Sequence, residues 1–241
     1  MSSALNQEAS PSRHEVWKMF DRIAPRYDVL NRALSMRQDV TWRKKMTRYL
    51  PDGEDLELLD LATGTADQIL FLLKSTKRIK RAVGMDLSEG MLAVGEVKVG
   101  ASPWKEQIQL QVGNTMDIPA EDASFDVATI SFGIRNASDV NKGLTEMHRV
   151  LRTGGRALIL ECSVPGNSFI RALYLMYFRH VLPFVGGLVS GDAKAYKYLN
   201  KTVETFPCGQ AFASLMEQAG FTHVQVHPQT LGVATIYVGE R

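Results

Sequence analysis

Apolar residues recur along this chain with two different periods, and the change between them marks out its elements. From about Val16 to Leu50 the spacing is helical, and Pro51-Asp52-Gly53 forms a turn that closes this segment. Short apolar runs follow, each typical of a buried strand. They are Leu56–Ala62, Arg81–Asp86, Ile108–Val112, Phe125–Ser131 and Arg156–Cys162. Because helical stretches alternate with these runs, the pattern predicts a parallel, doubly wound α/β sheet.

The helices and the C-terminal strands complete the predicted fold. Helices are expected over Asp67–Leu73, over a segment capped by Ser88, and over about Val140–Leu151. The last two strands run from Gly220 to about Val226 and from Gly232 to Val238, with no helix between them. Strands joined so closely are antiparallel, so we expect a hairpin at the edge of the sheet.

The most apolar stretch, Phe169–Val189, has about the length of a membrane span. Arg171 and Arg179 interrupt it, and such charges are costly in a bilayer core. We therefore expect a broken pair of helices and no transmembrane segment. The polar N-terminus resembles neither a signal peptide nor a transit peptide, and its first ten or so residues are expected to be frayed.

The composition is that of an ordinary globular protein without a strong charge bias. The 241 residues are 45% hydrophobic and 22% charged, and the net charge is +2. Disordered and fibrous classes are thereby excluded, and a more basic chain would be expected of a nucleic-acid-binding protein. Cys162 and Cys208 lack the spacing of metal ligands, and the five histidines are scattered, so no metal site is expected. This cysteine usage favours a reducing cytoplasm.

Two loops that follow predicted strands carry candidate binding residues. The first contains Asp60, Gly64 and Thr65 but not the G-x-G-x-x-G pattern, so a pyrophosphate cradle for NAD or FAD is poorly supported. Asp86 ends the second strand, where a carboxylate can accept hydrogen bonds from both ribose hydroxyls of a nucleoside. Its alternative role is a helix cap, which Ser88 can supply by itself.

Two further loops lie at the ends of the third and fourth strands. Gly113-Asn114-Thr115 would lie beside an adenine ring, or would be a bare turn, and Ser131–Asn136 follows the fourth strand. Open α/β sheets bind ligands at the carboxyl ends of their strands. The four loops together therefore predict an adenosine pocket without a pyrophosphate cradle.

Motifs from roughly Val16 to the C-terminus also carry a family resemblance. They are Phe20–Ala24, Tyr27–Asn31, Leu34-Ser35 with Trp42-Arg43, Leu59–Asp67, Ser131–Asn136, Arg149–Arg156, Tyr198-Leu199, Phe206-Pro207, Ala219–Phe221 and Gly232–Ala234. On these motifs the chain resembles class I S-adenosylmethionine-dependent methyltransferases and, within them, the UbiE/MenG family of quinone C-methyltransferases. The blocks Tyr27–Trp42 and Ser131–Asn136 are specific to this family, whereas the middle blocks are common to many methyltransferases.

The resemblance implies a class I methyltransferase (Rossmann-like) α/β fold with a C-terminal antiparallel strand and an N-terminal helical lid. It implies a single domain with a lid (1–50), a cofactor-binding core (51–163), a helical insert on the substrate side (164–205), and a C-terminal helix and hairpin (206–241). The implied cofactor is S-adenosyl-L-methionine, with contacts at Thr65, Asp86, Asn114, Thr115 and Ser131. Gly64 and Asp60 of the first loop are expected to join them.

The implied reaction is C-methylation of a demethylated quinol, demethylmenaquinol first, in menaquinone biosynthesis. A ring carbon is nucleophilic only when the ring is reduced and a neighbouring hydroxyl loses its proton, so the site must remove a proton or stabilise an oxyanion. We expect Arg135 and Asn136 to polarise a water or hold the phenolate, and Tyr27 and Asp28 to orient the ring. The alternatives are a methyltransferase acting on another small molecule, including a ubiquinone precursor, and a non-catalytic module that binds an adenosine ligand.

Two positions depart from the family pattern. Asp39 stands three residues before Trp42, where the family usually has a histidine, and Ala66 stands where a glycine is frequent. Alanine is small enough to preserve that turn.

The expected partner is a prenylated quinol, and no nucleic-acid partner is expected. The basic run Trp42–Lys45 with Arg48 is either a solvated helix face or a contact for anionic lipid head groups. The aromatic stretch Leu173–Phe184 is either core or the wall of an apolar channel for the prenyl tail. A cytoplasmic protein is expected, and the sequence is compatible with peripheral contact at the inner face of the cytoplasmic membrane and with a homodimer.

Overall fold

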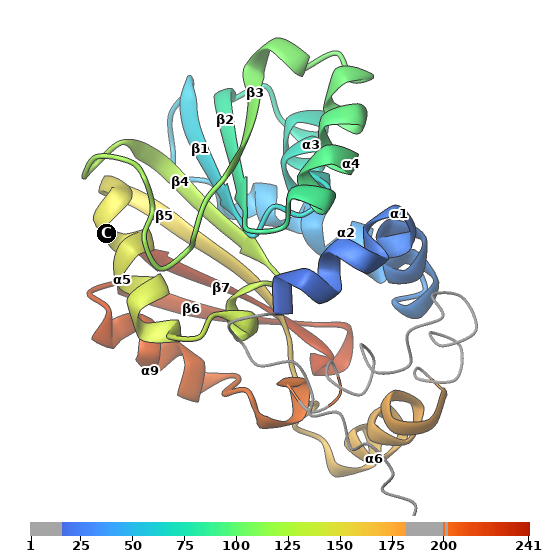
Figure 1. The fold of residues 1–241 in the computed structure, drawn as a ribbon. Helices are drawn as coiled ribbons and strands as arrows, with labels where there is room; N and C mark the ends of the chain where they lie inside the picture. The colour runs from blue at the N-terminus through green and yellow to red at the C-terminus, as the bar shows by residue number, and fades with distance from the viewer. Residues whose placement is uncertain (1–15, 182–199, 201) are drawn as a thin grey trace, which may run out of the picture.

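Seven strands form a single sheet at the centre of the part of the chain that the computed structural model describes, which is residues 16–181, 200 and 202–241 (Figure 1). Their order is β3-β2-β1-β4-β5-β7-β6. Their bounds are β1 Leu56–Leu61, β2 Ile79–Asp86, β3 Ile108–Val112, β4 Phe125–Ser131, β5 Leu151–Cys162, β6 Thr222–Gln229 and β7 Ala234–Glu240. The first five are parallel, and β7 is antiparallel to both β5 and β6. The predicted doubly wound sheet with a C-terminal hairpin at its edge is confirmed.

Some strand bounds differ from the prediction for local reasons. β5 begins at Leu151, directly after a helix, and not at Arg156. Leu151 pairs with Phe125, and the register shifts before Arg156, so the polar, glycine-containing residues between them interrupt the apolar pattern without ending the strand. The hairpin strands begin two residues later than predicted because Gly220 and Gly232 adopt left-handed backbone, with φ values of +104° and +91°.

Helices cover both faces of the sheet, α3 and α4 on one side and α5 and α9 on the other (Figure 1). The helices are α1 Val16–Leu34, α2 Gln38–Lys45, α3 Asp67–Ser75, α4 Glu89–Gly100, α5 Val140–Val150, α6 Ser168–Met176 and α9 Gln210–Gln218. Short helical turns add η1 Met46–Tyr49, η2 Lys105–Gln107, η3 Ile134–Asn136, the π-helical η4 Tyr177–Val181 and η5 Thr230–Gly232. Ser88 caps α4 as predicted, because its Oγ accepts a hydrogen bond from the Met91 amide at 3.2 Å.

Two hydrophobic cores hold the helices against the sheet. Ile69 and Leu72 of α3 are buried on one face, and Leu144 and Met147 of α5 are buried on the other. Both faces of the sheet are therefore covered, and the central strands β1 and β4 are buried at nearly every position. The expected helix pair over Phe169–Val189 is described only through α6 and η4, since residues 182–189 lie outside the described residues, as do the first fifteen.

The lid, which we define as α1, α2 and η1, lies across the carboxyl ends of the central strands. The helical pattern from Val16 to Leu50 is broken at Met36 and Arg37, whose φ values of 50° and 62° turn the chain between α1 and α2. Leu30 packs in a third buried cluster with Phe178 of η4. Within the residues described, we find no helix that combines the length and the apolar character needed to cross a membrane.

Candidate active site

Two adjoining cavities lie between the lid and the loops at the carboxyl ends of the strands. The first, which we call the loop cavity, has a volume of about 200 Å³ and is lined by all four predicted loops. The second, the lid cavity, has a volume of about 270 Å³ and is lined mainly by apolar and aromatic side chains of α1, α2, α6 and η4. Both cavities are lined by Phe20, Tyr27, Phe132 and Asn136. A molecule in one cavity can therefore meet a molecule in the other at these four residues.

The first and second loops are tied together at the loop cavity through Asp86. One carboxylate oxygen accepts a hydrogen bond from the Gly64 amide at 2.8 Å, and the other accepts one from the Ser88 amide at 2.9 Å. Burial raises the pKa of Asp86, although the backbone bonds from Ser88 and Gly64 oppose this shift. Each oxygen keeps a further lone pair, so the carboxylate can still accept hydrogen bonds from a ligand's hydroxyl groups.

The third and fourth loops close the same cavity. Asn114 and Thr115 line it, and the Asn114 side chain accepts a bond from the Met116 amide at 3.0 Å, which fixes the turn. Ser131 also lines it and donates to Gln68 Oε1 at 2.9 Å. Gly133 packs so tightly that a Cβ there would stand 2.6 Å from the Cβ of Ala62. Five predicted binding residues are thus brought together: Gly64, Asp86, Asn114, Thr115 and Ser131.

Two other predicted binding residues do not line either cavity. Asp60 is 1% exposed and accepts bonds from the hydroxyls of Thr63 at 2.6 Å and Thr129 at 2.5 Å. Thr65 is equally buried and donates to Asp28 Oδ1 at 2.6 Å. Both side chains therefore stabilise the first loop without facing either cavity. Ala66 has φ of 62° at 0% exposure, so the expected turn is retained with alanine in place of glycine.

The buried carboxyl group of Asp60 should make stability depend on pH. Burial raises its pKa from 3.8 to about 6, against the opposing bonds from Thr129 and Thr63. The folded protein then keeps a proton that the unfolded chain releases, so this stabilisation is full below about pH 4 and is lost as the pH rises through about 6. Asp60→Asn should therefore gain about 1–3 kcal/mol over the wild type at pH 8 and little at pH 4.

Urea unfolding at several pH values measures this difference. The exposed Asp122→Asn serves as the matched control, since its side chain is 71% exposed. A constant difference between Asp60→Asn and the wild type from pH 4 to pH 8 would show that the buried carboxyl has no such shift.

Arg135 supplies a fixed cation at the lid cavity. Its Nη1 donates to Glu161 Oε1 at 2.5 Å and to the Phe132 carbonyl at 2.7 Å, and both ionic side chains are buried. Burial lowers the pKa of Arg135, but the adjacent Glu161 carboxylate outweighs burial and raises it overall. Its Nε has no hydrogen-bond partner. Arg135 and Asn136 thus line the lid cavity, as does Tyr27, and the catalytic roles expected of them stay predictions.

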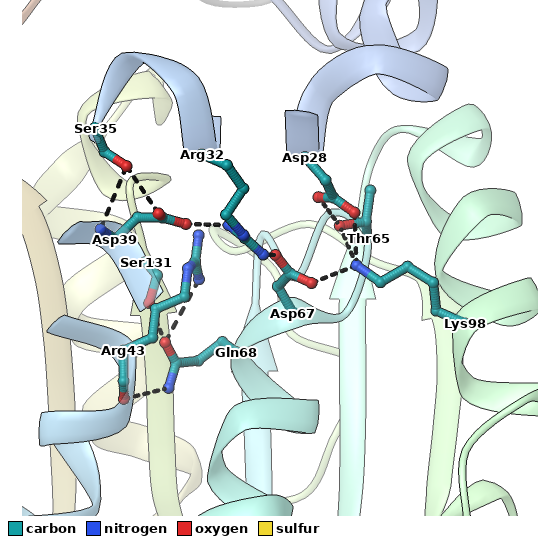
Figure 2. Close-up of polar contacts among 10 residues, drawn as sticks. All are labelled: Asp28, Arg32, Ser35, Asp39, Arg43, Thr65, Asp67, Gln68, Lys98 and Ser131. Atoms are coloured by element: carbon teal, nitrogen blue, oxygen red, sulfur yellow. Dashed lines mark hydrogen bonds and ion pairs between the residues drawn. The ribbon is translucent and has the colours of Figure 1, made fainter. Parts of the chain in front are cut away.

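Asp28 does not line either cavity, so the structure gives no support to its expected contact with the ring. Its carboxylate accepts from Lys98 Nζ at 2.7 Å, and Lys98 also pairs with Asp67. Arg32 continues the chain of ion pairs from Asp67 to Asp39. Figure 2 shows this network joining the lid to the start of α3 and to α4. Sequence reasoning missed it because all its pairs except Arg32–Asp39 are 31 to 70 residues apart in the chain, and no motif relates them.

The sequence left two interpretations open for the basic run and for the aromatic stretch, and the structure bears on both. In the basic run, Trp42 and Arg43 are buried, and Trp42 Nε1 donates to Thr230 at 2.8 Å. Only part of the run is therefore a solvated face. Of the aromatic stretch, Tyr174 and Phe178 line the lid cavity, which favours a channel wall over a purely structural core.

The doubly wound sheet with antiparallel β7 beside β5 is the fold of solved S-adenosylmethionine-dependent methyltransferases. Solved structures agree on the fold. A methyltransferase from Thermotoga maritima is 20% identical, with a TM-score of 0.64 over 93% of this chain and 99% of that chain. One from Methanococcus maripaludis is 16% identical, with a TM-score of 0.63 over 100% of this chain and 97% of that chain.

The chain belongs to the ubiE/COQ5 methyltransferase family, whose model matches residues 7–241. Its sequence is similar to the "Ubiquinone/menaquinone biosynthesis C-methyltransferase UbiE" of Geobacter sulfurreducens, with 45% identity over 92% of this chain and 87% of that protein. It is also similar to the "Demethylmenaquinone methyltransferase" of Thermus thermophilus, with 41% identity over 92% of this chain and 100% of that protein. The protein of that name from Bacteroides fragilis is 37% identical over 94% of this chain and 92% of that protein. The chain is an S-adenosylmethionine-dependent methyltransferase.

The loop cavity fits this methyl donor. Gly64 lines this cavity with left-handed backbone, where φ is +56°, and a Cβ there would stand 3.1 Å from Met91 Cε. Asp86 presents a half-buried carboxylate to this cavity, where it can accept hydrogen bonds from ribose hydroxyls, and Asn114 lines the same cavity. When bound, the donor supplies a methyl group on a positively charged sulfur, which is already activated for transfer.

Proposed function

We propose that this enzyme methylates a ring carbon of a demethylated, prenylated quinol, and that demethylmenaquinol is its substrate in menaquinone biosynthesis. The observation that carries the proposal is the adjoining pair of cavities, of which the loop cavity is the more polar, with four residues common to both. The names of the relatives support the chemistry, since one specifies C-methylation in ubiquinone and menaquinone biosynthesis and the others name demethylmenaquinone. The preference for demethylmenaquinol rests on the relatives from Bacteroides fragilis and Thermus thermophilus.

In this proposal the loop cavity holds the methyl donor. Asp86 accepts hydrogen bonds from the ribose hydroxyls, while Asn114 and Thr115 lie beside the adenine. Gly64 and Ser131 complete the wall around the donor. Residues 51–163 accordingly form the cofactor-binding core, and residues 206–241 close the sheet behind it.

The lid cavity holds the quinol ring between the lid helices α1 and α2 and the segment formed by α6 and η4. Tyr27 and Asn136 line both cavities and can position the ring against the donor. The fixed cation of Arg135 stabilises the negative charge that develops on the quinol oxygen as a proton leaves. The aromatic side chains Tyr174 and Phe178 face the same cavity and can contact an apolar ring or the start of its tail.

A prenylated substrate resides in lipid, which supports peripheral contact with the inner face of the cytoplasmic membrane. α6 presents Phe169 and Met176, 71% and 57% exposed, close to the lid cavity that its Tyr174 lines. Exposed apolar side chains of this kind can enter the head-group region of a bilayer. A homodimer stays a prediction.

Transfer of a labelled methyl group to a demethylmenaquinone analogue tests the proposal. The analogue is offered in reduced and in oxidised form, with S-adenosylmethionine that carries the label. We expect label in the quinone fraction only with the reduced acceptor, because only the reduced ring carries a hydroxyl that can give up a proton. No label with the reduced acceptor, in a protein that binds S-adenosylhomocysteine, would contradict the proposed acceptor.

A further inference from the structure

The lid cavity is lined by very few groups that could accept a proton. Among the described residues around it, Asp39 is the single carboxylate, and no histidine or lysine lines it. The other groups there that can ionise are Tyr27, Arg135, Cys162, Tyr174 and Tyr177. A reaction that removes a proton from a substrate in this cavity must therefore use one of these six side chains or water.

The other five side chains keep their protons near neutral pH. Burial raises the pKa of Tyr27, in spite of the nearby Arg43, and also that of Tyr174 and Tyr177. Burial raises the pKa of the Cys162 thiol to about 12. Arg135 is a permanent cation beside Glu161. None of these groups is a proton acceptor in the working pH range.

Asp39 lines the lid cavity, and both of its carboxylate oxygens are held by neighbouring side chains. One carboxylate oxygen pairs with Arg32, and the second accepts a hydrogen bond from Ser35 Oγ at 2.8 Å. The residue is 2% exposed, and Ser35 lines the same cavity. Figure 2 shows Arg32 between Asp39 and Asp67, so the anchoring cation is itself fixed from the core. An anchored carboxylate on an apolar cavity can accept a proton without changing its position.

We propose that Asp39 is the catalytic residue that accepts the proton of the quinol hydroxyl next to the methylated ring carbon. This inference rests on the proposed function. As the O–H bond breaks, its electron pair forms a carbonyl, and the ring carbon attacks the methyl group. The C–CH3 bond forms, the S–CH3 bond breaks, and that electron pair stays on sulfur. The ring C–H proton is then lost to water, and the oxygen regains its proton from Asp39, so one proton is released overall.

Asp39 could instead only stabilise the structure through Arg32. A variant of Asp67 distinguishes this structural role from the catalytic one. Both carboxylates pair with Arg32, but Asp67 does not line the lid cavity. Asp67→Asn is therefore a matched control that weakens the same network while leaving the cavity wall intact.

The experiment compares single-turnover methylation of the reduced quinone analogue by wild type, Asp39→Asn and Asp67→Asn. We expect Asp39→Asn to lose about 10²–10⁴-fold in rate and Asp67→Asn to lose less than about tenfold, below the range for an acid–base group. Calorimetry with S-adenosylhomocysteine and circular dichroism confirm that donor binding and folding persist. Equal rates for the two variants would overturn the inference, whereas an inactive wild type would contradict the proposed function itself.

A second test replaces Asp39 by histidine and measures the pH dependence of the rate. This pH dependence should not change if Asp39 is only structural. The ordinary pKa of histidine is about 6.5, against about 3.9 for aspartate, so the acid limb of the rate profile should move to higher pH in Asp39→His. Arg32 faces this position from α1, with Asp67 of α3 and Lys98 of α4 behind it. The five other ionisable groups around the lid cavity are the same in every variant. An acid limb that stays at the wild-type pH in Asp39→His would overturn the inference.

Discussion

Replacing Arg135 by methionine should lower the free energy of unfolding by about 3–5 kcal/mol, because it leaves a buried carboxylate without its partner. Glu161 is 1% exposed, and its Oε1 lies 2.5 Å from Arg135 Nη1. The same oxygen also accepts from the Cys162 amide at 2.8 Å, which compensates the charge only in part. Urea unfolding at pH 7, followed by circular dichroism, measures the loss.

The double variant Arg135→Met/Glu161→Leu separates this cause from a loss of packing. With both charges removed, most of the lost stability should return, since an apolar pair of similar volume costs no desolvation. A single variant that unfolds at the wild-type urea concentration would contradict the buried ion pair. A double variant no more stable than the single one would assign the loss to packing around Arg135.

Asp86→Asn should weaken binding of S-adenosylhomocysteine by about ten- to a hundredfold, since charge-assisted hydrogen bonds contribute roughly 1.5–3 kcal/mol each. The amide nitrogen would also face a backbone N–H, because the two carboxylate oxygens accept from Gly64 and Ser88. The first loop would thereby lose part of its support at the same time. The fold should persist, as Ser88 caps α4 without help from Asp86.

Calorimetric titration measures this affinity, and Asp139→Asn is the matched control. Asp139 also bonds to a backbone amide, that of Lys142 at 3.0 Å at the start of α5, but it does not line the loop cavity. Its variant should bind as tightly as the wild type. Unchanged affinity in a folded Asp86→Asn would mean that the nucleoside lies elsewhere.

Sequence reasoning predicted most of the fold because the strands are short, apolar and separated by recognisable turns. β3 and β4 begin and end at the predicted residues, and Ser88 caps α4 as expected. The site loops could also be placed, since parallel strands bring their carboxyl ends to one edge. The start of β5 could not be predicted, because Gly154 and its polar neighbours interrupt the apolar pattern inside the strand.

The other differences between expectation and structure concern which way a side chain points. Asp60 and Asp86 both stand near the end of a strand, yet the first bonds to Thr129 inside the sheet and the second to Gly64 at the cavity. Asp28 was expected at the ring and instead pairs with Lys98 of α4. Such distinctions depend on partners far away in the chain, which the local pattern of one sequence does not contain.

The position of the transferred methyl group tests the central claim most directly. The enzyme is incubated with S-adenosylmethionine carrying a carbon-13 methyl group and a reduced demethylmenaquinone analogue, and the product is examined by NMR. The adjoining cavities predict a methyl group bonded to the ring carbon next to a hydroxyl-bearing carbon. A methyl ether on the hydroxyl oxygen, or label that never reaches the quinone, would contradict the account.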